Sequence, residues 1–290
     1  MLTRHSSENR FLVDHIISLN AFGCPLSSHE SHFKDAKAAK NQHHSCGIWL
    51  TASYINHSCL SNARRSFIGD LQLVHATRDL PTDTELTFWY HTPTGGSYEE
   101  TQKGLQNWGF ECDCALCLDA KNTPKKLLKR RDALRGDLNT TLLNASAIDA
   151  AKAERLLAAI EQTYKSPPSK VPRLALWDPY LLLARVYAAQ KQPAKVVSLA
   201  LKVLESLGFV IKGAHIPTSS SIPFEVEQWG VMMDGVVEAW IRLCNAYVTF
   251  APHMLQKAEE CAKVAYRICI GEDVTFDESY GEKARQAHST

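Results

Sequence analysis

The spacing of hydrophobic and polar residues divides the chain into two parts near residue 120. Before that point, short apolar runs are separated by turn-forming residues, which is typical of short strands. Beyond Leu127, apolar residues recur three and four positions apart, which predicts amphipathic helices. The helices that we expect there span residues 124–135, 147–164, 179–189, 193–207, 224–250 and 252–270.

In the first 120 residues the pattern predicts a helix, a hairpin and one further strand. Residues 6–19 carry apolar side chains at helical spacing. Gly69-Asp70 separates two apolar segments, 66–68 and 71–75, and is a turn signal between two strands. Residues 85–90 are rich in Thr and aromatic residues, which favours a strand. Residues 27–44 are polar and repetitive, and we interpret them as a mobile insertion.

Within the helical part, two helix pairs have a tetratricopeptide-like pattern of small and large residues. The pattern first occurs at Tyr180, Ala184 and Tyr187. It occurs a second time from Trp240 and Cys244 onward. The two units lie about 60 residues apart, whereas tetratricopeptide repeats follow each other every 34 residues or so. We therefore expect an irregular helical domain with repeat-like hairpins.

Composition and charge exclude two classes of protein. At 290 residues the chain has room for about two domains. Its 32 basic and 31 acidic residues give a net charge of +1, too balanced for a protein that coats nucleic acid. The segment 45–63, which has no Asp, Glu, Lys or Arg, contains Asn56, His57 and Asn62, which a membrane interior does not tolerate. We expect no direct sequence-specific nucleic-acid binding and no membrane segment.

The cysteine pattern predicts a metal site in a reducing compartment. Three of the nine cysteines, Cys112, Cys114 and Cys117, lie within six residues, in a chain without the apolar core of a signal peptide. Such spacing suits one tetrahedral zinc ion better than a disulfide framework. Cys59, Cys46 and Cys24 are the candidates for a fourth ligand. The alternative to a metal site is a chance cluster of reduced thiols. The other three cysteines are expected to be core residues: Cys244, Cys261 and Cys269.

Two other segments are ambiguous when each is taken alone. Asn56-His57-Ser58-Cys59 follows an apolar run, and by itself it predicts either a satisfied buried polar network or a turn. The segment Glu85-Leu86-Thr87-Phe88-Trp89-Tyr90 is an aromatic strand that ends in a phenol. Such a strand is by itself more often core than active site.

Taken in order, these segments resemble one family, the SET-domain protein lysine methyltransferases, and especially its SET–MYND branch with a helical C-terminal domain. That family has an Asn-His-Ser-Cys motif, a strand of the form Glu-Leu/Ile-Thr-x-x-Tyr and a Phe-x-Cys-x-Cys-x-x-Cys post-SET segment. Here they match residues 56–59, 85–90 and 110–117. Asn20-Ala21-Phe22 is also similar to an Asn-x-Phe element of the family.

The resemblance implies a fold class and a domain organisation. The fold would be α+β, with the C-terminal half of a β-rich SET fold, a zinc-binding post-SET segment and an all-α tetratricopeptide-like domain. The partial SET domain would span residues 1–110, the post-SET zinc segment 111–123 and the helical domain 124–290. We expect the family's Gly-x-Gly half and MYND finger to be missing, because neither has a counterpart before Asn20.

The resemblance also implies a role for individual residues. Tyr90 would lie where the methyl group is transferred, and four cysteines would hold one structural zinc ion: Cys59, Cys112, Cys114 and Cys117. The residues that would contact S-adenosylmethionine are Asn20, Asn56, His57 and Phe110. Trp108 stands where many members of the family have a second active-site tyrosine.

Two hypotheses for the function follow. The first is an S-adenosylmethionine-dependent methyltransferase that acts on a lysine of a protein or peptide, with histones as one candidate, in the nucleus, the cytoplasm or both. The second is a catalytically inactive, zinc-stabilised scaffold whose helical domain binds a protein partner. A basic run at 125–131 is expected to be a solvated helix face, with a nuclear localisation signal or a contact for acidic chromatin as the alternatives.

Overall fold

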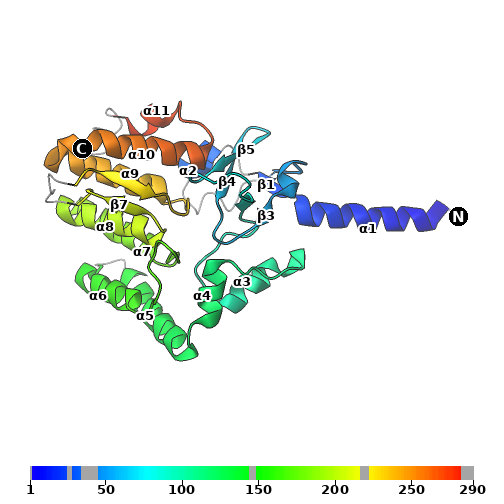
Figure 1. The fold of residues 1–290 in the computed structure, drawn as a ribbon, viewed down its shortest axis with the longest axis horizontal. Helices are drawn as coiled ribbons and strands as arrows, with labels where there is room; N and C mark the ends of the chain where they lie inside the picture. The colour runs from blue at the N-terminus through cyan, green and yellow to red at the C-terminus, as the bar shows by residue number, and fades with distance from the viewer. Residues whose placement is uncertain (1, 25–27, 34–44, 144–147, 216–221, 282–290) are drawn as a thin grey trace.

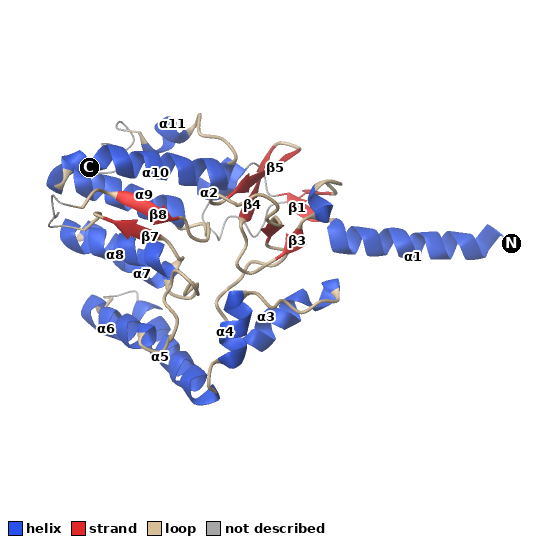
Figure 2. Ribbon diagram, viewed as in Figure 1, coloured by secondary structure: helices blue, strands red, loops and turns tan. Residues whose placement is uncertain are grey.

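The computed structural model describes residues 2–24, 28–33, 45–143, 148–215 and 222–281. Short strands and their loops form one part, and layered helices form the other (Figures 1 and 2). The chain begins with α1 (Leu2–Asn20), which contains the predicted helix 6–19 and extends away from the rest of the molecule (Figure 1). Phe11, Leu12 and Ile16 of its apolar face are exposed.

The strands pair two by two in small sheets. Two antiparallel pairs and one parallel pair lie before residue 90: β1 (Phe22–Cys24) with β2 (Ser45–Gly47), β4 (Ala63–Ile68) with β5 (Leu71–Ala76), and, in parallel, β3 (Asn56–His57) with β6 (Thr87–Phe88). The predicted hairpin is confirmed, since Ile68 pairs with Leu71 and Gly69 adopts the left-handed conformation that the two-residue turn requires. The strand predicted over 85–90 is confirmed only at Thr87–Phe88.

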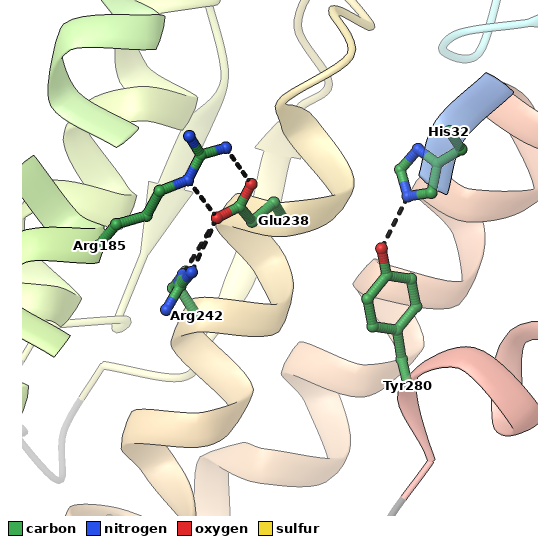
Figure 3. A network of polar contacts seen from close by, with 5 residues as sticks. All are labelled: His32, Arg185, Glu238, Arg242 and Tyr280. Carbon is green, nitrogen blue, oxygen red and sulfur yellow. Dashed lines mark hydrogen bonds and ion pairs between the residues drawn. The ribbon is translucent and has the colours of Figure 1, made fainter. Parts of the chain in front are cut away.

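The insertion predicted over residues 27–44 contains one described helix. Residues 28–33 form a helix, α2 (Ser28–Phe33), whereas residue 27 and residues 34–44 lie outside the described residues. The helix packs against β4 and α10, and His32 is hydrogen-bonded through Nε2 to the Tyr280 hydroxyl, 2.7 Å away (Figure 3). A segment that looks polar in sequence therefore joins the two parts of the molecule.

Two helices follow the strands and belong to the thiol-rich segment. α3 (Tyr98–Leu105) begins with a capping box, in which the Ser97 hydroxyl and the Glu100 carboxylate each bond the other residue's backbone N–H. α4 (Ala115–Asn122) starts directly after Cys114. Single turns of 3-10 helix occur at Ala52–Tyr54 and Gln106–Trp108.

The rest of the chain is mainly helical, as predicted. Its helices are α5 (Lys125–Leu143), α6 (Ala150–Glu161), α7 (Trp177–Ala189), α8 (Pro193–Ser206), α9 (Val236–Phe250), α10 (Pro252–Ile270) and α11 (Phe276–Tyr280). Successive helices α7 to α10 pack side by side (Figure 1). A network of ion pairs joins α7 to α9, in which Glu238 accepts from Arg185 and Arg242 (Figure 3). None of the described helices is both long and apolar enough to cross a membrane.

The expectation that this domain is all-α is wrong at one place. The first part of the helix predicted over 224–250 is a strand, β8 (Glu225–Gln228), paired antiparallel with β7 (Val210–Lys212). In β8 the side chains alternate between exposed and half-buried, a period of two rather than 3.6. Residues 229–235 separate the strand from α9. They include Gly230, where a Cβ would lie 2.3 Å from the carbonyl oxygen of Leu207, so the close approach of the two segments requires glycine.

Candidate active site and thiol cluster

The parallel pairing of β3 with β6 brings together two motifs that are about thirty residues apart in sequence. Asn56 lies opposite Thr87, and His57 lies opposite Phe88. The Asn56 side chain donates to Oε1 of Glu85 at 2.7 Å. Tyr90, two residues beyond the end of β6, is thereby held next to His57.

The buried Asn62 is a residue of this site that sequence reasoning assigned no role. Its Nδ2 donates to the carbonyl oxygen of Glu85, and its Oδ1 accepts from the backbone N–H of Thr87, both at 2.8 Å. One amide side chain thus ties β6 to the segment before β4, in addition to the pairing of β6 with β3. An Asn shortly after the Asn-His-Ser-Cys motif was the only signal in the sequence.

The His57 ring connects the Tyr90 strand with the thiol cluster. Nδ1 accepts the backbone N–H of Tyr90 at 3.0 Å, and Nε2 lies 3.3 Å from Sγ of Cys59. Because Nδ1 is an acceptor, the proton of the neutral ring must be on Nε2, where it points at sulfur. The side chain of His57 is therefore engaged within the protein.

Tyr90 is the polar member of an aromatic cluster. Its hydroxyl donates to the carbonyl oxygen of Ile55 at 2.9 Å, and its ring centroid lies 5.3 Å from that of Trp108 and 6.2 Å from that of Phe110. Burial raises the pKa of the Tyr90 phenol, so the hydroxyl stays protonated at neutral pH. The cluster is a half-buried aromatic site with one fixed hydroxyl.

Four cysteines form the second part of the site. The sulfur atoms of Cys59, Cys112, Cys114 and Cys117 all lie within 4.8 Å of one another, and those of Cys59 and Cys117 are 3.7 Å apart. In a tetrahedral site with Zn–S bonds of about 2.3 Å, two sulfurs are about 3.8 Å apart. The arrangement fits one four-coordinate zinc ion, and Cys46, an alternative fourth ligand, is exposed and not in the group.

The chemistry of the four thiols also fits a cation. Hydrogen bonds from Cys112, Cys114 and Cys117, together with burial, raise the pKa of the Cys59 thiol above its usual range. Four sulfurs at this separation cannot all ionise without a positive charge between them. Four thiolates would complete the coordination of zinc, so such an ion would be structural.

The remaining predicted residues lie around this centre in different ways. Phe110 is 37% exposed, and its ring lies 5.9 Å from that of His57. The Asn20 side chain donates to the carbonyl oxygen of Ile16 in its own helix at 3.0 Å. The end of α1 nevertheless reaches the site, because the Trp108 indole donates to the carbonyl oxygen of Leu19 at 3.1 Å.

Comparison with known proteins relates the sequence to one family. Residues 2–91 match the model of the SET domain. A protein named "Methyltransferase" from Gibberella zeae is 40% identical over 277 residues, which are 92% of this chain and 38% of that protein. Human "Histone-lysine N-methyltransferase SMYD3" is 23% identical over 65% of this chain and 40% of its own length. "Histone-lysine N-methyltransferase SET5" of Meyerozyma guilliermondii is 38% identical over 25% of this chain and 16% of its own length.

The chain thus spans well under half the length of these curated relatives. The match to the SET domain covers both strand motifs around Tyr90, and two of the three relatives are named as lysine methyltransferases. The chain belongs to the SET-domain lysine methyltransferase family, in its SMYD-like branch.

Proposed function

We propose that the chain forms the catalytic strand, the post-SET segment and the helical domain of an S-adenosylmethionine-dependent protein lysine methyltransferase. The observation that carries the proposal is the convergence of three motifs. The pairing of β3 with β6 brings Asn56 and His57 to the strand that precedes Tyr90, and the His57 ring contacts both Tyr90 and Cys59 of the thiol cluster. An aromatic site with a fixed hydroxyl suits transfer to an amine.

The residues present are compatible with the cofactor. The half-exposed Phe110 ring offers an aromatic face on which an adenine can stack. Its centroid lies 5.9 Å from that of His57, which follows the exposed Asn56 on β3. S-adenosylmethionine supplies a methyl group on a positively charged sulfur, an electrophile that needs no covalent activation. The protein has to hold the acceptor in line, which is worth up to roughly 7–11 kcal/mol in ideal cases.

Tyr90 is suited to orient the acceptor amine. Its proton is directed to the Ile55 carbonyl, so the phenol oxygen is left as an acceptor for an N–H of the lysine. The lysine must lose its proton before it can attack, although its ordinary pKa is ~10.4. The rings of Trp108 and Phe110 beside Tyr90 exclude water, and desolvation favours the neutral amine.

We infer that zinc binds Cys59, Cys112, Cys114 and Cys117 as a structural ion. It would tie the loop after β3 to the segment that carries Trp108 and Phe110, so the aromatic walls would depend on it. The relatives named histone-lysine methyltransferases make histones the first acceptors to test, and an intracellular site, in the nucleus or the cytoplasm, follows from such an acceptor. The packed helices α7 to α10 are the proposed surface for a protein partner, in a tetratricopeptide-like arrangement.

The test is calorimetric titration of S-adenosylmethionine into zinc-loaded protein, followed by methyl transfer to core histones. We expect Asn56→Ala to abolish cofactor binding. Tyr90→Phe should bind the cofactor but transfer methyl groups about a hundredfold more slowly, the usual cost of one orienting hydroxyl. Tyr54→Phe, at a tyrosine that is 88% exposed, is the matched control and should behave as the wild type. Folded, zinc-loaded protein that binds no cofactor would contradict the proposal and leave the scaffold hypothesis.

A further inference from the structure

A separate cavity lies between the thiol cluster and the helical part. Cys59 and Cys117 line it on one side, and Arg131 and Tyr164 line it on the other. Its free volume is about 60 Å³, whereas one water molecule needs roughly 10–15 Å³ on the same measure. The cavity has room for a group of a few heavy atoms, and it does not include Tyr90 or Phe110.

Arg131 brings a permanent positive charge to this cavity. The residue is only 8% exposed, although it belongs to the basic run that was expected to be a solvated helix face. Its Nε donates to Oγ1 of Thr163 at 2.9 Å and its Nη2 to the Thr163 carbonyl oxygen at 3.0 Å. The guanidinium also stacks over the Tyr164 ring at 3.7 Å. All these partners are electrically neutral.

The neighbouring Arg173 has a carboxylate partner, which Arg131 lacks among the described residues. It lies over the same Tyr164 ring, at 5.2 Å, but pairs with the Glu161 carboxylate at 3.4 Å. Arg131 takes part in none of the ion pairs found among the described residues, and its Nη1 has no hydrogen-bond partner there. Nη1 is also absent from the fully buried unpaired atoms of that part of the chain, so it keeps some accessible surface, and Arg131 is one of the residues that line the cavity.

A buried guanidinium with no carboxylate within ion-pair distance is unfavourable, because the charge has lost much of its hydration. An oxyanion is the group that restores the balance, since carboxylate and phosphate oxygens match the planar donors of arginine. Asp119 also lines the cavity, and Ser166 is its hydrogen-bond partner at 3.5 Å. Its charge opposes an anion, which therefore has to lie on the Arg131 side.

We propose that this cavity is a binding site for an oxyanion group, a carboxylate or a phosphate, held by Nη1 of Arg131. The ligand is either a free small anion or an acidic side chain of a bound polypeptide. The proposal does not depend on methyl transfer.

The experiment measures binding of two probes to zinc-loaded protein at constant ionic strength, inorganic phosphate and N-acetylglutamate amide. We expect saturable binding of at least one probe to the wild type, with affinity reduced roughly tenfold or more in Arg131→Gln, the cost of a hydrogen bond to a charged group. Arg130→Gln removes the same charge from an exposed neighbour and should bind as the wild type. Phosphate binding alone identifies a free anion, and binding of the glutamate amide identifies an acidic side chain.

A second variant keeps the test valid if Arg131→Gln does not fold. Ala120 lines the cavity from α4, and Ala120→Leu fills it while leaving Arg131 in place. This variant should lose binding to the same extent. Equal binding by the wild type, Arg131→Gln and Ala120→Leu would show an adventitious ion only and would overturn the proposal, as would the absence of saturable binding of either probe to the wild type.

Discussion

The two parts of the molecule are held together by different forces. In the helical part, one apolar cluster between Leu138 and Phe276 contains most of the fully buried hydrophobic side chains of the described chain. In the SET part, the cluster around the site consists of Leu105 and three cysteines, with aromatic rings against it. Apolar burial is sufficient to explain the stability of the helical part. The stability of the SET part depends on polar contacts and on the ion that we propose for the thiols.

The largest effect should follow from metal removal. Structural zinc contributes about 10–16 kcal/mol in zinc-finger peptides, so a chelator or Cys112→Ser should release zinc and unfold the segment around residues 52–117. The helical part should keep its structure, because its core contains none of these cysteines. Hydrogen exchange read segment by segment, together with zinc content, checks this.

Cys46→Ser is the control for metal removal, because Cys46 is an exposed free thiol outside the cluster. It should keep one zinc ion per chain. If the helical part lost its protection in step with the cysteine segment, the two parts would form a single cooperative unit and the comparison would fail.

The next largest effect should follow from a cavity in the helical core, which destabilises the helical part and leaves the thiol cluster intact. Leu183 on α7 is fully buried, so Leu183→Ala should cost about 2–5 kcal/mol of unfolding free energy. Leu143→Ala, at an 80% exposed position, should cost little. Urea unfolding followed by circular dichroism measures both. Loss of zinc from folded Leu183→Ala would show that the thiol cluster needs the helical core.

The sequence could predict the elements that local contacts determine, but not those that depend on tertiary contacts. The bounds of α10 follow from its pattern, with Pro252 at the first turn and Gly271 after the last, and the structure confirms the predicted span. The β4–β5 hairpin is also local, because Gly69-Asp70 dictates its turn. By contrast, the strand at Glu225–Gln228 was predicted as helix, since its pairing with β7 is a tertiary contact.

At the candidate site, the residue types could be recognised by their motifs but their arrangement could not. The pairing of Asn56 with Thr87 closes a loop of about thirty residues, which no local pattern specifies. Burial of Arg131 was missed for a similar reason, because Thr163 and Tyr164, which cover it, follow α6, about thirty residues further along the chain. Sequence therefore identified the chemistry of the site and left its geometry to tertiary structure.

A smaller effect concerns the amide that holds β6. Asn62→Ala leaves the Glu85 carbonyl and the Thr87 N–H without their partner, which should cost about 1–3 kcal/mol. Asn56 also bonds Glu85, but through exposed side chains, so Asn56→Ala should cost less than about 1 kcal/mol. Chemical unfolding of the zinc-loaded variants measures the difference. Equal costs would mean that burial of Asn62 does not matter.

The smallest effect is a pH dependence at the join between the two parts. Burial lowers the pKa of His32 from 6.5, and the nearby Asp234 offsets this only in part. Below pH 6.5 the unfolded chain takes up a proton that the folded protein does not. The contribution of His32 to stability is therefore complete above pH 6.5 and decreases as the pH falls through 6.5 toward the lower pKa of the folded state.

Urea unfolding at about pH 7.5 and about pH 5.5 separates this contribution from that of other groups. His75 also has a pKa lowered by burial, so the wild type loses stability on acidification for more than one reason. His32→Gln can still bond the Tyr280 hydroxyl but cannot titrate, so it should lose less stability than the wild type between the two pH values. An identical loss in both proteins would mean that α2 and the helical part are joined without a proton-dependent contact at His32.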